Sequence, residues 1–200
     1  MKARRFLCLL LLTWLASANA ATTVLTPATF PKTTVTDVSG REHELPARGE
    51  AKATVLIFLT HDCPIANAFA PEIGRLRADY PPQQVAFVLV QVDPQLTPAA
   101  ARQHALEFGH DCPVVLDRKH GLVKRAGATV TPEAVVLRPD GGIAYRGRID
   151  DRFTDFGKQR PAPTQRDLRA ALDAVLAGKP VPNATTKAIG CFITDLKPTN

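Results

Sequence analysis

Five consecutive residues, Thr60-His61-Asp62-Cys63-Pro64, bring together side chains that could do chemistry. They follow directly on an apolar run from Thr54 to Leu59, which predicts a buried strand, and a helix is expected to open behind Cys63. Free N–H groups and the positive dipole end at a helix N-terminus favour thiolate over thiol. A free thiol titrates at about 8.5, and such a site can lower that pKa substantially. We therefore interpret Cys63 as a nucleophile; the alternative is an inert buried cysteine.

The neighbours of Cys63 could tune such a thiolate. The Thr60 hydroxyl could donate a hydrogen bond to the thiolate or to a peroxide. A protonated His61 would favour the thiolate, whereas the carboxylate of Asp62 would oppose it. The alternative for His61 and Asp62 is a solvated pair of loop residues.

The first twenty residues have the pattern of a secretory signal peptide. Lys2, Arg4 and Arg5 precede a short apolar stretch, and Ala18-Asn19-Ala20 fits a cleavage site. The apolar stretch is too short to span a bilayer comfortably. We expect cleavage near Ala20, a periplasmic or secreted protein and no stable membrane span after processing; an uncleaved anchor is the alternative.

The charge of the chain gives no indication of nucleic-acid binding. The chain of 200 residues carries a formal charge of +6. Loss of residues 1–20 would remove three basic and no acidic side chains and lower the charge to +3. No basic stripe predicts nucleic-acid binding in the remainder.

Export would place the remaining cysteines in an oxidising compartment, where disulfides can form. Beyond residue 20 the chain keeps Cys63, Cys112 and Cys191, an odd number in an oxidising compartment. At most one internal disulfide can form, which is too few for a disulfide-stapled scaffold. A catalytic or redox role is favoured over a purely structural one.

The periodicity of the rest predicts an α/β protein with a mixed sheet. Strands are expected at residues 53–59, 85–92, 114–117, 134–138 and 143–148, after a small hairpin at 33–38 and 42–45. Helices are expected at residues 65–80, kinked by Pro71, and at 98–108, 120–125 and 165–177. A polar loop is expected at 150–163. The predicted organisation is a signal peptide (1–20), a leader (21–32), one domain (33–178) and a C-terminal tail (179–200).

Four local features resemble the thioredoxin superfamily, specifically its exported redoxin (AhpC/TSA- and thioredoxin-like) members. A buried strand runs into Cys63-Pro64, Pro71 lies eight residues past that cysteine, Thr131-Pro132 precedes a strand, and Asp140-Gly141 turns a hairpin. The resemblance implies a thioredoxin-like fold, with a mixed central sheet flanked by helices, an N-terminal hairpin and a C-terminal tail. It also implies a cis bond between Thr131 and Pro132, packed beside the reactive sulfur. From the residues alone, a proline before a strand is more often a turn residue.

Two departures place the chain between branches of this superfamily. The fourth position of the thioredoxin Cys-x-x-Cys motif is Ala66, so the usual resolving cysteine is absent. Thr60 and Cys63 match the Thr-x-x-Cys part of the peroxiredoxin motif, but Leu56 stands at its proline position. The second sulfur must therefore come from elsewhere in the chain or from an external thiol.

Cys191 is the better candidate for that second sulfur. It lies in an apolar segment, Ile189 to Ile193, of an otherwise polar tail, and such a segment should dock. We predict that it covers Cys63 and can form a Cys63–Cys191 disulfide. Cys112 precedes its strand, whereas sites gather at the carboxyl ends of parallel strands, so it reads as a packed loop cysteine and a less favoured partner. Arg148 could stabilise a thiolate, although a solvated charge pair is the alternative.

These residues predict an exported thiol-dependent oxidoreductase. Its partners would be a protein or small-molecule disulfide or peroxide and an external thiol reductant, with no cofactor and no metal. One alternative is a thiol peroxidase of peroxiredoxin type, which Thr60 supports. A second is a copper-binding assembly factor, for which thiolates and imidazoles suit Cu(I), although position 67 is asparagine rather than cysteine. A third is a redox-silent adaptor that keeps only the fold.

Overall fold

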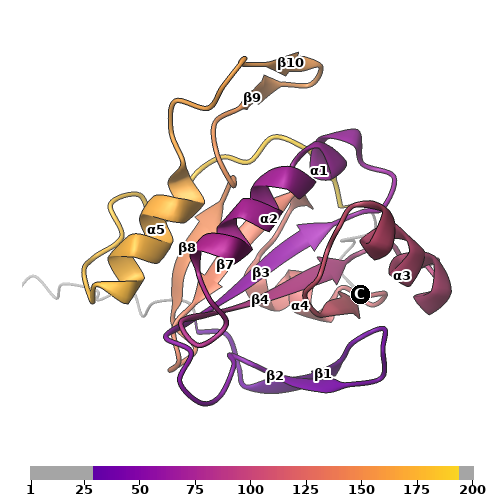
Figure 1. Ribbon diagram of the computed structural model, residues 1–200, viewed down its shortest axis with the longest axis horizontal. Helices are drawn as coiled ribbons and strands as arrows, with labels where there is room; N and C mark the ends of the chain where they lie inside the picture. Colours follow the sequence, from indigo (N-terminus) through magenta and orange to yellow (C-terminus); the bar gives the residue numbers. More distant parts are fainter. Residues whose placement is uncertain (1–28, 194–200) are drawn as a thin grey trace, which may run out of the picture.

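A five-stranded mixed sheet forms the centre of the molecule in the computed structural model, which describes residues 29–193 (Figure 1). Its strand order is β5-β4-β3-β7-β8. β3, β4 and β5 run parallel, whereas β7 is antiparallel to both β3 and β8. The bounds are β3 Ala53–Leu59, β4 Val85–Gln91, β5 Val114–Leu116, β7 Glu133–Leu137 and β8 Ile143–Gly147. The predicted mixed α/β fold is confirmed.

Helices cover both faces of this sheet. Their bounds are α1 Pro64–Ala68, α2 Ala70–Asp79, α3 Pro98–Glu107, α4 Gly121–Ala126 and α5 Asp167–Leu176. On one face, Val55 and Ile57 of β3 share a hydrophobic cluster with Ile73 of α2 and Leu168 of α5. The alternate β3 residues belong to a second cluster that includes α4 and the N-terminal hairpin. All of β3 is therefore buried, as expected for the central strand of a sheet that is covered on both sides.

The predicted kink at Pro71 is a break between two helices. α1 ends at Ala68 and α2 begins at Ala70, with Pro71 in its first turn. Proline has no N–H to donate to the preceding turn, so the helix cannot continue through this point without loss. Phe69 bridges the break, and its N–H donates to the Ala66 carbonyl at 3.1 Å.

The small hairpins differ in how well their sequences predicted them. β1 (Thr33–Thr36) and β2 (Glu42–Leu45) form the expected N-terminal hairpin. The expected polar loop at 150–163 contains a second hairpin, β9 (Phe153–Asp155) with β10 (Lys158–Gln159), which projects from the body in Figure 1. Its short and mostly polar strands carry no hydrophobic alternation, so no strand could be predicted there.

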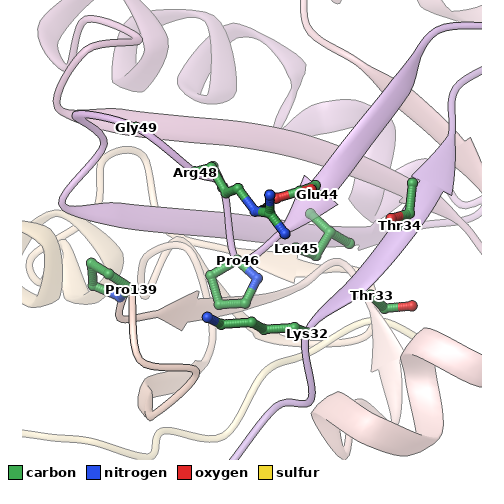
Figure 2. A pocket seen from close by; sticks show the side chains of 10 residues that line it. Lys32, Thr33, Thr34, Glu44, Leu45, Pro46, Arg48, Gly49 and Pro139 are labelled. Atoms are coloured by element: carbon green, nitrogen blue, oxygen red, sulfur yellow. Dashed lines mark ion pairs between the residues drawn. The ribbon is translucent and has the colours of Figure 1, made fainter.

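A cavity of about 330 Å³ lies against the N-terminal hairpin. Figure 2 shows Lys32 and Pro139 at this cavity, with Arg48 paired to Glu44. Pro139 follows the end of β7 that pairs with the start of β3, so the cavity lies at the opposite end of β3 from Cys63.

The end of the expected leader is attached to the fold. The side chain of Phe30, in the expected leader, is buried, and its N–H donates to Gly141 at 2.8 Å. The expected signal peptide and residues 21–28 lie outside the described residues. No helix within residues 29–193 is both long and apolar enough to cross a membrane.

Residues 184–193, here called the strap, run along the fold rather than away from it. The backbone of Arg146 in β8 bonds Ala184 at 2.9 Å and Thr186 at 3.1 Å. The strap then forms β11 (Cys191–Phe192), which pairs antiparallel with β6 (Val130–Thr131).

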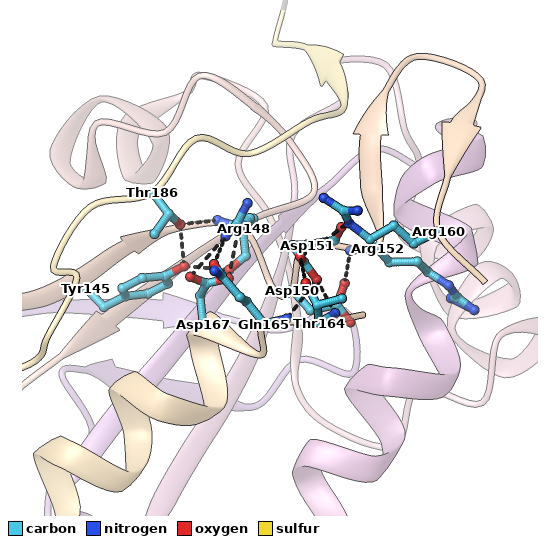
Figure 3. Close-up of polar contacts among 10 residues, drawn as sticks. All are labelled: Tyr145, Arg148, Asp150, Asp151, Arg152, Arg160, Thr164, Gln165, Asp167 and Thr186. Carbon is cyan, nitrogen blue, oxygen red and sulfur yellow. Dashed lines mark hydrogen bonds and ion pairs between the residues drawn. The ribbon is translucent and has the colours of Figure 1, made fainter. Parts of the chain in front are cut away.

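One hydroxyl fastens the strap to a polar network. Thr186 Oγ1 lies 2.6 Å from Tyr145 Oη and accepts from the Arg148 backbone N–H at 3.1 Å (Figure 3). The Arg148 guanidinium in turn donates to Asp167 of α5 at 2.7 Å. The start of the strap is thereby tied to β8 and, through Arg148, to α5.

Replacing Thr186 with valine should loosen the strap. The change keeps the shape of the side chain but leaves the Arg148 N–H and the Tyr145 hydroxyl without this partner, at a cost of about 1–3 kcal/mol. Urea unfolding of Thr186→Val against wild type measures the loss. Thr185→Val is the matched control, because that side chain is exposed; equal stability of both variants would contradict the assignment.

Candidate redox site

Cys63 stands between the central strand and the first helix. It is the N-cap residue of α1, with Pro64 in the first helical position, and its carbonyl accepts from Asn67 N–H at 3.0 Å. The residue is only 1% exposed. The predicted placement at the carboxyl end of a parallel strand is therefore what the structure shows, but the thiol is covered.

The cover is the strap. Cys191 Sγ lies 2.6 Å from Cys63 Sγ, although the two residues are 128 positions apart in the chain. Cys191 is held by its pairing with Thr131 in β6, and Ile193 N–H donates to Thr129 at 3.0 Å. Gly190 makes this approach possible, since a Cβ there would overlap the Thr131 carbonyl. Backbone contacts on both sides of Cys191 therefore hold the two sulfurs together.

Thr131 connects the three segments that meet at the site. Its carbonyl accepts from Cys63 Sγ at 3.2 Å. Its hydroxyl lies 2.9 Å from the Thr60 hydroxyl and donates a long bond, 3.5 Å, to the Cys191 carbonyl. The bond from Thr131 to Pro132 is cis, as the resemblance implied. Thr60 thus contacts the reactive region through Thr131, whereas the sequence suggested a direct bond to sulfur.

The surroundings of Cys191 favour the protonated form of its thiol. Burial raises the pKa of the Cys191 thiol to about 12, with further contributions from its hydrogen bond to Cys63 and from the charges of Cys63 and Asp62. Cys191 therefore keeps its proton at neutral pH and donates it toward Cys63.

His61 faces a polar network rather than the sulfur pair. Its ring nitrogen lies 3.2 Å from Asp93, and its carbonyl accepts from the Asn67 side chain at 2.9 Å. Asn67 also accepts from His104 Nε2 at 2.9 Å. Burial and the nearby His61 lower the pKa of His104, which favours the neutral imidazole. Asn67 and His104 support the loop before Cys63, a role that could not be predicted because nothing in their spacing links α1 to α3.

Two other candidate residues lie apart from the sulfur pair. Cys112 precedes β5 at the opposite pole, and burial raises its thiol pKa to about 11. Arg148 gives its guanidinium to Asp167 and to Gln165, the latter at 2.6 Å. Within residues 29–193, no group of three or more histidine, cysteine or acidic side chains is arranged to hold a metal ion.

Gly190→Ala should separate the two sulfurs. The added methyl group would meet the Thr131 carbonyl, so β11 would have to lift from β6. We expect at least a severalfold slower formation of the Cys63–Cys191 disulfide under mild oxidation, followed by non-reducing peptide mapping. Gly74→Ala is the control, since a Cβ at Gly74 meets nothing within 4 Å. An unchanged rate in Gly190→Ala would show that the strap does not control the pairing.

The sequence matches a known protein family. The model of the AhpC/TSA family matches residues 27–146, a range that includes Cys63 and Pro132 but not Cys191. A comparison with curated proteins gives no match. The match to the AhpC/TSA family model covers more than half of the chain.

Solved structures share the fold. An uncharacterized conserved protein from Geobacillus kaustophilus is 30% identical, with a TM-score of 0.73 over 87% of this chain and 93% of that one. A hypothetical protein from Sinorhizobium meliloti is 26% identical, with a TM-score of 0.73 over 84% and 92%. A putative thiol:disulfide interchange protein DsbE from Chlorobium tepidum is 16% identical, with a TM-score of 0.59 over 75% and 96%. The chain belongs to the AhpC/TSA family, among the redoxins of the thioredoxin superfamily.

Proposed function

We propose that this redoxin is an exported thiol-disulfide oxidoreductase that uses Cys63 and Cys191 as its redox pair. The observation that carries the proposal is the 2.6 Å separation of their sulfurs. Export rests on the signal-peptide pattern of residues 1–20, which suits a protein that handles disulfides. The cis Pro132 and the Thr131 carbonyl beside Cys63 would position the sulfur and the incoming disulfide.

The reaction would proceed in two exchanges. The Cys63 thiolate attacks a substrate disulfide, forms a mixed disulfide and releases one substrate thiolate. Cys191 then attacks the Cys63 sulfur, forms Cys63–Cys191 and releases the second substrate thiolate. Because the pKa of Cys191 is raised to about 12, its proton must pass to the departing thiolate as it attacks. An external thiol would return the pair to the reduced state.

A thiol peroxidase is the second candidate. Cys63 is only 1% exposed, so a small oxidant reaches it more readily than a protein disulfide does while the strap stays docked. Attack on a peroxide oxygen would give a sulfenic acid at Cys63 and release an alcohol or water. Cys191 would then displace water and form the same disulfide. The copper-binding alternative has less support, because Asn67 stands where a second thiolate would be needed and is bonded to His61 and His104.

Single substitutions of the three cysteines should give three different outcomes. Cys63→Ser should abolish reduction of bis(2-hydroxyethyl) disulfide and of a disulfide-bonded protein. Cys191→Ser should retain the first exchange and accumulate a mixed disulfide on Cys63, which mass mapping after acid quenching would detect. Cys112→Ser should keep the wild-type rate, because that thiol lies at the other pole.

Peroxide turnover by the same variants separates the two candidates. If hydrogen peroxide is consumed in a Cys63-dependent reaction at a higher rate than disulfides are reduced, the protein is better assigned as a peroxidase. Wild-type rates of both reactions in folded Cys63→Ser protein, checked by circular dichroism, would refute both.

A further inference from the structure

The two sulfurs of the proposed pair differ in their access to solvent. Cys63 is 1% exposed, whereas Cys191 is only partly buried, and Phe192 beside it is 74% exposed. Cys191 lines a cavity of about 300 Å³, and Cys63 does not. A thiol that approaches the oxidised pair therefore meets the Cys191 sulfur first.

The mouth of this cavity carries acidic side chains. Asp62 and Asp93 line it together with Cys191, and none of the described residues that line it is a lysine or arginine. Asp62 and Cys191 line the same cavity, and the Asp62 charge is the smallest of the contributions that raise the pKa of the Cys191 thiol. His61 lies 3.2 Å from Asp93 and, when protonated, offsets that carboxylate. His120 also lines the cavity, and its Nε2 lies 2.8 Å from the Val92 carbonyl oxygen.

We propose that the oxidised pair is reduced by attack at Cys191, and that Asp62, with Asp93, makes this entry selective for cationic over anionic thiols. The inference rests on the proposed function and specifies the reductant class. An incoming thiolate bonds to Cys191 Sγ, the Cys63–Cys191 bond breaks, and Cys63 leaves as a thiolate. A second thiolate then attacks the mixed disulfide, releases Cys191, which takes up a proton, and leaves as the oxidised reductant.

The test compares small thiols that differ in charge. Oxidised wild-type protein is reduced by cysteamine, 2-mercaptoethanol or 3-mercaptopropionate at about 10 mM ionic strength, where the Debye length is about 30 Å. Each rate is divided by the rate of the same thiol with neutral bis(2-hydroxyethyl) disulfide, which removes differences in thiol pKa and nucleophilicity. We expect the normalised ratio of cysteamine to 3-mercaptopropionate to be about tenfold, and to fall toward one near 1 M salt.

Three variants locate the source of the selectivity. Asp62→Asn should lower the ratio severalfold, and Asp93→Asn should lower it less because of His61. Glu50→Gln is the matched control: it removes an exposed acidic group ahead of β3, at the other end of that strand, and should leave the ratio unchanged. The ratio of the cysteamine rate to the 3-mercaptopropionate rate is the readout. An effect of Asp62 on Cys63 as leaving group would change the rates of all thiols by the same factor and leave this ratio unchanged.

Quenching in acid with N-ethylmaleimide identifies the sulfur that is attacked. The expected intermediate carries cysteamine on Cys191 and maleimide on Cys63. Cysteamine on Cys63, or a normalised ratio near one in wild type at low salt, would overturn the inference while leaving the redox pair intact. If the oxidised protein contained no Cys63–Cys191 disulfide that 2-mercaptoethanol could reduce, the proposed function would be refuted, and the inference with it.

Discussion

The antiparallel pairing of β11 with β6 is the interaction on which the site depends. It places Cys191 opposite Thr131, and the Thr131 carbonyl is the group that contacts Cys63 Sγ. Glu133 supports β6 from the other side, since its carboxylate accepts from Thr129 N–H at 2.7 Å. Without this short pairing, nothing would hold Cys191 of the strap against Cys63 at the end of β3.

The pairing is supported by contacts on both sides of it along the strap. Thr186 fixes the strap to β8, and Ile193 fixes it to Thr129, so the segment between them has little slack. Gly190 removes the side chain that would otherwise hold the strap away from Thr131. A long loop closes at a modest additional entropic cost, so the distance along the chain is not an obstacle when both anchors are in place.

Patterns that repeat along the chain were predictable, and contacts between distant segments were not. The apolar run at β3 and the Thr97-Pro98 start of α3 follow directly from local physics: Thr97 accepts from Ala100 N–H at 3.1 Å as a helix cap. The position of Cys191 could be anticipated because an apolar segment in a polar tail must find cover. The polar contacts of Thr60 and Asn67 could not be anticipated, since each depends on a partner brought near only by the folded sheet.

The absence of a second cysteine in the motif changes which sulfur faces the solvent. In a Cys-x-x-Cys site both sulfurs lie on one turn of chain, so the attacking cysteine can remain open to its partner. Here Ala66 occupies the fourth position and is buried, and the second sulfur arrives on a strap that passes over the first. Under the proposed function, the covering segment would serve both as redox partner and as lid. In that case the strap would limit which molecules reach Cys63, and the charges of Asp62 and Asp93 would limit which thiols reach Cys191.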